Sequence, residues 1–250
     1  MKHCKLVLTS LLGGILIGGI AFATGDKAHW SYEGHEGPAN WGELSQDYST
    51  CNSGKSQSPV NINTSTTVKL ADIKFSYSAA PIDVVNNGHT IQMNYAKGSS
   101  INVGGKAYNL LQFHFHSPSE HHLNGKPYDM VAHLVHQAAD GELGVIGVLM
   151  KVGKANPVIA SIWKQLPTKA GEHNTVKDTL NVADLLPAKQ HYFNYSGSLT
   201  TPPCSEGVNW MVLQTPVEVS AEQVANFTNI FAKSVRPVQP LNDRTIHANK

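Results

Sequence analysis

Two histidines separated by one residue, His114 and His116, are the first feature of the chain whose residue types and spacing could do chemistry. A β-strand points alternate side chains to opposite faces, so the two imidazoles would share one face of a strand. His133 lies in the next strongly β-like segment. Adjacent strands are about 4.8 Å apart, so its ring could complete a triangle with the other two. Zinc accepts imidazole nitrogens, and three protein ligands leave its fourth position open for water.

The same spacing also fits ordinary polar side chains on a half-exposed strand, because a short His-x-His motif is weakly specific. The chain contains 13 histidines, and so rich a supply produces such coincidences. His133 therefore adds only moderate support. The choice between a metal site and a solvated strand depends on the rest of the sequence.

The elements that would position these histidines are mostly short β-type segments bounded by turn residues. These segments are residues 73–77, 84–85, 90–95, 100–103, 106–111, 112–116, 130–136, 145–152 and 208–214. Gly104-Gly105 and Asn124-Gly125 predict turns. Helical spacing occurs only over residues 157–165 and 221–233, the second with Ser220 and Gln223 in capping-box positions. Residues 24–52 read as irregular, and the whole pattern predicts one mainly β (α+β) domain.

The composition excludes several classes of protein. The 41% hydrophobic share of the 250 residues is too high for a disordered chain, and no internal repeat is present. The formal net charge is +1, so there is no strong field to attract nucleic acid or an anionic membrane surface.

The start of the chain is typical of an export signal. Lysines at positions 2 and 5 precede an uncharged stretch over residues 6–23, which ends in the small-x-small pattern Ala21-Phe22-Ala23. We expect residues 1–23 to be a cleaved signal peptide and residues 24–250 to form the mature domain, in the periplasm or outside the cell. The alternative is an uncleaved anchor, because the stretch reaches the short edge of a membrane span.

Export would bring Cys51 and Cys204 into an oxidising compartment, where they could pair. In the chain-entropy model, closing so long a loop stabilises a protein by about 5 kcal/mol. Two buried free thiols are the alternative, and pairing is the better interpretation.

Several motifs, in a fixed order, make the sequence resemble the α-class carbonic anhydrases, in particular their bacterial secreted branch. The matches are residues 29–32, 57–62, 86–89, 112–116 (Gln-Phe-His-Phe-His), 119–121 (Ser-Glu-His), 133–136 (His-Leu-Val-His), 198–203 (Ser-Leu-Thr-Thr-Pro-Pro) and 236–241. They extend over nearly the whole mature chain. Each motif alone is weak, and the ordered set is highly specific.

The resemblance implies zinc-dependent, reversible hydration of carbon dioxide to bicarbonate and a proton. His114, His116 and His133 would bind Zn²⁺, and a zinc-activated hydroxide would attack carbon dioxide. Thr200 matches the residue that accepts a hydrogen bond from this hydroxide and donates its own proton to a carboxylate, which Glu120 matches. An ionised carboxylate only accepts, so the direction of this hydrogen bond is fixed.

The resemblance also assigns the proton shuttle, the substrate pocket and the water network. His89 matches the position of the proton shuttle. Histidine suits this role, because an imidazole with an unperturbed pKa near 6.5 exchanges protons at neutral pH. Thr201 would line the bicarbonate side. The residues that match the apolar wall for carbon dioxide are Val135, Val145, Leu199, Val208 and Trp210. Those that match the water network or support a ligand are Tyr32, Asn87, Gln92 and Gln112, the last beside His114.

One position departs from the family pattern. Val131 lies two residues before His133, on the same strand face, where many members have a glutamate that hydrogen-bonds the third ligand. Valine accepts no hydrogen bond, so His133 must find water, a backbone carbonyl or another side chain. Loss of such a partner typically costs 10–100-fold in metal affinity or activity, so we expect a working site with weaker zinc retention.

The family further implies a large, twisted, mostly antiparallel central sheet with peripheral helices, and cis peptides at Ser58-Pro59 and Pro202-Pro203. Sulfonamides or anions would be inhibitors, a homodimer is a further option, and no nucleic-acid partner or membrane anchor is expected after signal cleavage. Two other functions compete with the enzyme. One is a binding protein that has lost catalysis. The other is a zinc buffer that uses surface histidines, for which the candidates are His29, His35, His121 and His122.

Overall fold

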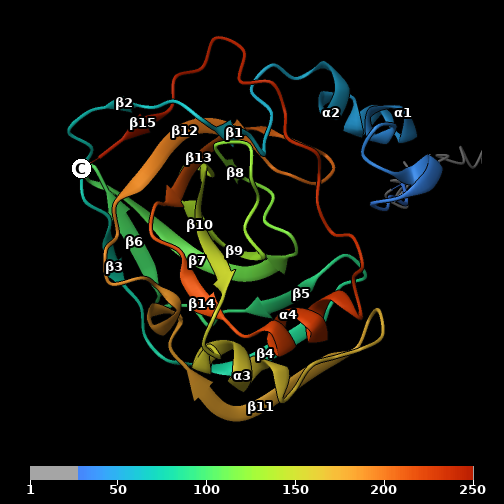
Figure 1. The fold of residues 1–250 in the computed structure, drawn as a ribbon, viewed down its shortest axis with the longest axis vertical. Helices are drawn as coiled ribbons and strands as arrows, with labels where there is room; N and C mark the ends of the chain where they lie inside the picture. Colours follow the sequence, from blue (N-terminus) through green and yellow to red (C-terminus); the bar gives the residue numbers. More distant parts are fainter. Residues whose placement is uncertain (1–27, 250) are drawn as a thin grey trace, which may run out of the picture.

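The computed structural model describes residues 28–249 and is organised around one sheet of 13 strands (Figure 1). The predicted signal peptide, residues 1–23, lies outside the described residues. In spatial order the main path of the sheet runs β11 (His173–Leu180), β4 (Ala80–Asn86), β5 (Ile91–Asn94), β7 (Lys106–His116), β9 (Met130–Ala138), β10 (Leu143–Val152), β13 (Glu206–Leu213), β12 (Tyr192–Ser198), β15 (His247–Ala248) and β2 (Thr66–Thr67).

Three strands lie off this path, and two form a separate small sheet. β6 (Ser100–Val103) pairs with both β7 and β3 (Lys74–Ser76), and β14 (Val217–Val219) pairs with β10. β1 (Asn61–Ile62) and β8 (His122–Leu123) pair with each other in parallel. In the large sheet the pairs β10–β13, β10–β14 and β15–β2 are parallel and the others antiparallel. The predicted fold class, a mostly antiparallel central sheet, is confirmed.

Strand β7 carries a β-bulge that sets which side chains face the site. Its pairing with β9 shifts register between Leu110 and Gln112, so Leu111 is an extra residue, 44% exposed. Sequence patterning predicted two adjoining strands that meet at this point. The structure has a single strand with one inserted residue, which interrupts the alternation of side chains without ending the strand.

The bulge keeps one face of β7 in the core while changing which positions point there. Tyr108 and Leu110 precede it and Phe113 and Phe115 follow it, and all four belong to the same buried cluster. If every residue of β7, including Leu111, alternated regularly, even-numbered positions would face that core along the whole strand. Because the bulge accommodates Leu111, Gln112 and the two histidines that follow lie on the opposite face.

Strand β9, next to β7, is buried on both faces. Ala132 and Leu134 belong to the same core as the phenylalanines of β7, whereas Val131 and Val135 belong to a second cluster on the other face. His133 alternates with these residues and therefore shares a face with the two valines. This arrangement explains the nearly continuous apolar pattern of the segment.

The helices are short and lie around the sheet (Figure 1). They are α1 (Trp41–Leu44), α2 (Thr50–Ser53), α3 (Pro157–Trp163) and α4 (Ala221–Thr228), with 3₁₀ turns η1 (Gly34–Glu36), η2 (Gln46–Tyr48) and η3 (Val182–Leu185). The sequence predicted α3 and α4. The capping box of Ser220 and Gln223 is present, but α4 ends at Thr228 instead of residue 233, because Asn and Thr at its end are weak helix formers.

Peptide bonds Ser58-Pro59 and Pro202-Pro203 are cis, as expected, and Ser117-Pro118 is a third cis bond that the sequence did not predict. Among residues 28–249, no helix combines the length and apolar character needed to cross a membrane.

Candidate active site

The three predicted ligands meet at one point. His114 and His133 are register partners across β7 and β9, and His116 lies two residues further along β7. One ring nitrogen from each of the three lies within 4.8 Å of the others. The alternation of β7 and the adjacency of β9 therefore place the rings as the spacing predicted.

Two of the three rings are held by acceptors on their far side. His114 Nδ1 donates to Gln112 Oε1 at 2.9 Å, and His116 Nδ1 donates to the Ser234 carbonyl at 2.5 Å. A proton on Nδ1 leaves the lone pair on Nε2. Nε2 of His116 is buried with no hydrogen-bond partner among the described residues, so it is free to bind a ligand in the space between the rings.

The third ring lacks such support. His133 Nδ1 lies 3.8 Å from Glu120 Oε2, the same oxygen that lies 3.6 Å from His116 Nε2. Nε2 of His133 is buried and has no hydrogen-bond partner among residues 28–249. Val131 is fully buried two residues earlier. No carbonyl or side chain of the described chain therefore replaces the acceptor that valine cannot provide.

Burial favours the neutral form of His114 and His133. It lowers the pKa of both His114 and His133 well below the usual range, and the neighbouring histidines act in the same direction. Imidazole must be neutral to bind a metal. The apolar surroundings thus favour the ligating form of these two rings.

Glu120 is a buried carboxylate that accepts a backbone hydrogen bond. Its Oε1 accepts the backbone N–H of Arg236 at 2.9 Å. Burial raises the pKa of Glu120, while His116, the Arg236 N–H and the hydroxyl of Thr200 each act in the opposite direction. Thr200 is itself buried. Glu120 thus lies beside His116 and His133, with Thr200 next to its carboxylate.

A cavity of about 130 Å³ connects two of these histidines to His89. Besides His114 and His116, its lining includes the predicted water-network residues Tyr32, Asn87, Gln92 and Gln112, together with Thr201. His89 is half-buried, and its ring stacks on Trp30 with centroids 3.7 Å apart. Burial lowers the pKa of His89, and His29 acts in the same direction.

The predicted apolar wall forms one cluster on the histidine face of the sheet. The five residues Val135, Val145, Leu199, Val208 and Trp210 belong to it or pack against it. The Trp210 ring lies 4.9 Å from that of His133, centroid to centroid. This apolar surface therefore borders the site.

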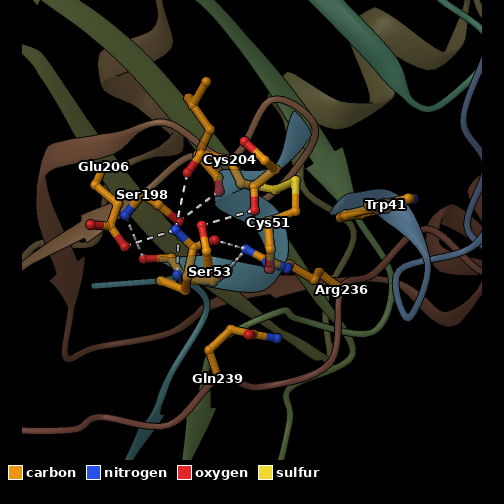
Figure 2. Close-up of a disulfide and its surroundings, with 12 residues drawn as sticks. Trp41, Cys51, Ser53, Ser198, Cys204, Glu206, Arg236 and Gln239 are labelled. Carbon is orange, nitrogen blue, oxygen red and sulfur yellow. Dashed lines mark hydrogen bonds between the residues drawn. A yellow bond between two sulfur atoms is a disulfide. The ribbon is translucent and has the colours of Figure 1, made fainter. Parts of the chain in front are cut away.

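A disulfide joins Cys51 and Cys204, which confirms the predicted pairing (Figure 2). Cys204 closes the turn that carries Thr200, because its N–H donates to the Thr201 carbonyl at 2.9 Å. The disulfide therefore attaches this turn to helix α2.

Comparison with known proteins agrees with this geometry. A family model described as eukaryotic-type carbonic anhydrase matches residues 36–250. The chain belongs to the carbonic anhydrase family. Family membership identifies it as an enzyme and supports the hydration of carbon dioxide as its reaction.

Bacterial members of the family are similar along nearly the whole chain. A carbonic anhydrase of Neisseria gonorrhoeae is 42% identical over 251 residues, covering 98% of this chain and 99% of its own. One of Pectobacterium carotovorum is 42% identical over 222 residues, covering 88% and 91%. The α-carbonic anhydrase of Thermovibrio ammonificans, solved in complex with the inhibitor sulfanilamide, has a TM-score of 0.87 at 44% identity, covering 89% of this chain and all of that one.

Some residues of the carbonic anhydrase site were missed or misplaced by sequence reasoning. His121 was considered a surface histidine, but it is fully buried and its Nε2 lies 2.6 Å from the Tyr195 hydroxyl. This removes it from the candidates for a surface zinc buffer. Trp30, Ser234 and Arg236 were given no role, because their contacts join segments far apart in the chain. Arg236 did lie within a matched motif, which was the only available signal.

Proposed function

We propose that the chain binds zinc through His114, His116 and His133 and hydrates carbon dioxide reversibly, with His89 as the proton shuttle. The observation that carries this proposal is the convergence of three ring nitrogens within 4.8 Å, one of them buried and without a partner. Three neutral imidazoles and an open fourth position are the donor set of a catalytic zinc site. When bound, zinc would supply Lewis acidity and lower the pKa of a water molecule.

The two nitrogens that approach Glu120 indicate which atoms would hold the metal. His116 Nε2 and His133 Nδ1 both lie within 4 Å of the same carboxylate oxygen. We assign these two atoms and His114 Nε2 to the metal. His133 Nε2 is then the outward nitrogen, and it is the one without an acceptor.

Thr200 and Glu120 would orient the attacking oxygen. Glu120 accepts a hydrogen bond from the Arg236 N–H. This N–H and the Thr200 hydroxyl both lower the pKa of Glu120 and so favour the ionised carboxylate. A hydroxyl that donates to a carboxylate keeps only its lone pairs for another partner. Thr200 would therefore accept a hydrogen bond from the attacking oxygen and aim that oxygen at the substrate.

Carbon dioxide carries no net charge, so its binding would depend on apolar surface. The cluster that contains Val145, Val208 and Trp210 borders His133 and offers such a surface. Thr201 would contact the bicarbonate product, since it lines the same cavity as His114 and His116.

His89 would carry the proton out of the cavity. It lies among the cavity-lining polar residues and is half-exposed. Its depressed pKa favours release of a proton to solvent after the ring has received one.

The test is stopped-flow hydration of carbon dioxide by the zinc-loaded protein, followed with a pH indicator. We expect fast hydration that sulfanilamide abolishes, and a loss of about 10²-fold in Thr200→Ala, the scale of one lost orienting interaction. A protein that holds zinc but does not hydrate carbon dioxide would instead be a binding protein or a zinc buffer.

We further propose export and cleavage after Ala23, which would release residues 24–250 into the periplasm or medium. The Cys51–Cys204 disulfide supports an oxidising compartment. N-terminal sequencing of protein from the native cell should begin at Thr24. A chain that still begins at Met1 would refute cleavage.

A further inference from the structure

Arg236 is a buried cation whose side-chain hydrogen bonds reach three residues. Only 3% of it is exposed. Its Nη1 donates to Gln57 Oε1 at 2.8 Å and to the Ser58 carbonyl at 2.9 Å, and its Nη2 donates to the Cys51 carbonyl at 2.8 Å. Figure 2 shows the guanidinium directed at the segment that carries the disulfide. Among residues 28–249 no carboxylate accepts from this guanidinium, and its acceptors are neutral groups.

The main chain of the same residue holds Glu120. Its N–H donates to Glu120 Oε1 at 2.9 Å. The position of Glu120 therefore depends on where the backbone of Arg236 is fixed. The side chain fixes that backbone, because its bonds tie it to the segment over Cys51–Ser58.

A second route leads from Arg236 to the turn that carries Thr200. Gln57 accepts from the guanidinium with its oxygen and donates from its Nε2 to the Cys204 carbonyl at 3.1 Å. Cys204 in turn donates to Thr201 at 2.9 Å. The amide of Gln57 thus bridges Arg236 and the end of this turn.

We propose that Arg236 is a positioning residue that sets the alignment of Thr200 with Glu120, holding Glu120 through its N–H and the Thr200 turn through Gln57. This proposal rests on the proposed function, since it assumes that the pair orients the attacking oxygen. A planar guanidinium can serve several acceptors at fixed angles. Lysine would retain the charge but not this geometry.

A double-mutant cycle on the zinc-loaded protein tests the proposal. Arg236→Met should lower kcat/KM for hydration about 10-fold, the lower end of the range for a supporting partner, with zinc content and KM unchanged. Thr200→Ala should cost about 10²-fold. Adding Arg236→Met to Thr200→Ala should cost nothing more, because the aligned group is already absent.

Ligand affinity gives a readout that is independent of turnover. The sulfonamide nitrogen of sulfanilamide has an N–H that can donate a hydrogen bond to an aligned threonine oxygen. Thiocyanate has no hydrogen to donate. Arg236→Met should weaken sulfanilamide about 10-fold and leave thiocyanate unchanged. Arg244→Met is the matched control. Arg244 also donates to backbone carbonyls, at Leu241, Ser196 and Pro240, but not to Glu120 or the Thr200 turn, so its loss should leave the ratio of the two affinities unchanged.

If the Arg236→Met variant does not fold, the test uses Gln57→Ala instead. The Gln57→Ala variant lacks the bridge to Cys204 and retains the buried guanidinium of Arg236. It should weaken sulfanilamide selectively. Equal losses for the two ligands, or additive losses in the cycle, would overturn the positioning role and leave the proposed function intact. Wild-type hydration by Thr200→Ala would overturn both the orienting role of Thr200 and this proposal.

Discussion

His114 and His133 face one another across β7 and β9, where they are register partners. The bulge at Leu111 preserves this relationship, because it accommodates one extra residue of β7 that would otherwise turn the later positions to the opposite face. The candidate metal site therefore depends on how β7 accommodates this residue.

Deletion of Leu111 should leave zinc binding intact. The deletion joins residues 110 and 112 directly, so the strand alternates regularly and His114 and His116 stay on the face opposite the core. Insertion of one alanine between Gln112 and Phe113 should abolish zinc binding, because it turns the two histidines toward the apolar core. We expect the deletion variant to retain zinc and the insertion variant to have a zinc content near zero, measured by atomic absorption. Leu111→Ala is the control. Its side chain is largely exposed, so stability should change by less than about 0.5 kcal/mol and zinc content should be retained. An insertion variant that still carries zinc would disprove this account of the strand faces.

Val131→Glu should tighten zinc binding about 10–100-fold. The buried Nε2 of His133 has no acceptor within residues 28–249, and a carboxylate at position 131 would lie on the same strand face. Zinc dissociation constants can be measured by competition with a chelator. Val131→Leu adds volume without an acceptor and should give no gain. An unchanged dissociation constant in Val131→Glu would show that the missing acceptor does not limit affinity.

Acid should destabilise the fold partly through His136. This ring accepts from the Tyr77 hydroxyl and donates to the Gly144 carbonyl, and burial lowers its pKa to about 4. The unfolded chain binds this proton near pH 6.5 and the folded chain only near pH 4. The contribution is therefore complete above pH 6.5 and is lost as the pH falls toward 4, by about 3 kcal/mol.

His136→Gln isolates that contribution, because glutamine does not titrate and the other groups are unchanged. Urea unfolding between pH 7 and 4 should show a smaller loss of unfolding free energy in the variant, by about 3 kcal/mol. Parallel curves for the two proteins would exclude His136 as a source of acid sensitivity.

His89→Ala should slow turnover by about 10²-fold while leaving kcat/KM for hydration nearly unchanged, because proton release follows the attack on substrate. Added imidazole buffer should restore kcat. The matched variant His191→Ala removes an exposed histidine that precedes β12 (Tyr192–Ser198), at the end of this strand opposite the turn that carries Thr200, and should have no effect. Loss of kcat/KM in His89→Ala without rescue by imidazole would point to damage of the pocket instead.

The sequence predicted the site better than it predicted the sheet. Alternation brought His114 and His116 to one face, and the ordered motifs supplied Glu120, Thr200 and the cysteine pair. Strands β11 and β12 were missed. β11 is an exposed edge strand with polar side chains on both faces, so it has no period-two pattern of apolar residues.

Contacts between distant segments were also invisible in the sequence. The burial of His121 depends on Tyr195 and Trp210, and the role of Arg236 depends on its bonds to Cys51, Gln57 and Ser58. Such contacts arise only when the fold is complete, because no local period or spacing encodes them.

The most direct test of the account is metal analysis of the mature protein together with hydration of carbon dioxide. We predict one zinc ion per chain. Removal by a chelator should abolish hydration, added zinc should restore it, and His114→Ala should lose both. Full hydration by a protein shown to contain no zinc would contradict the account.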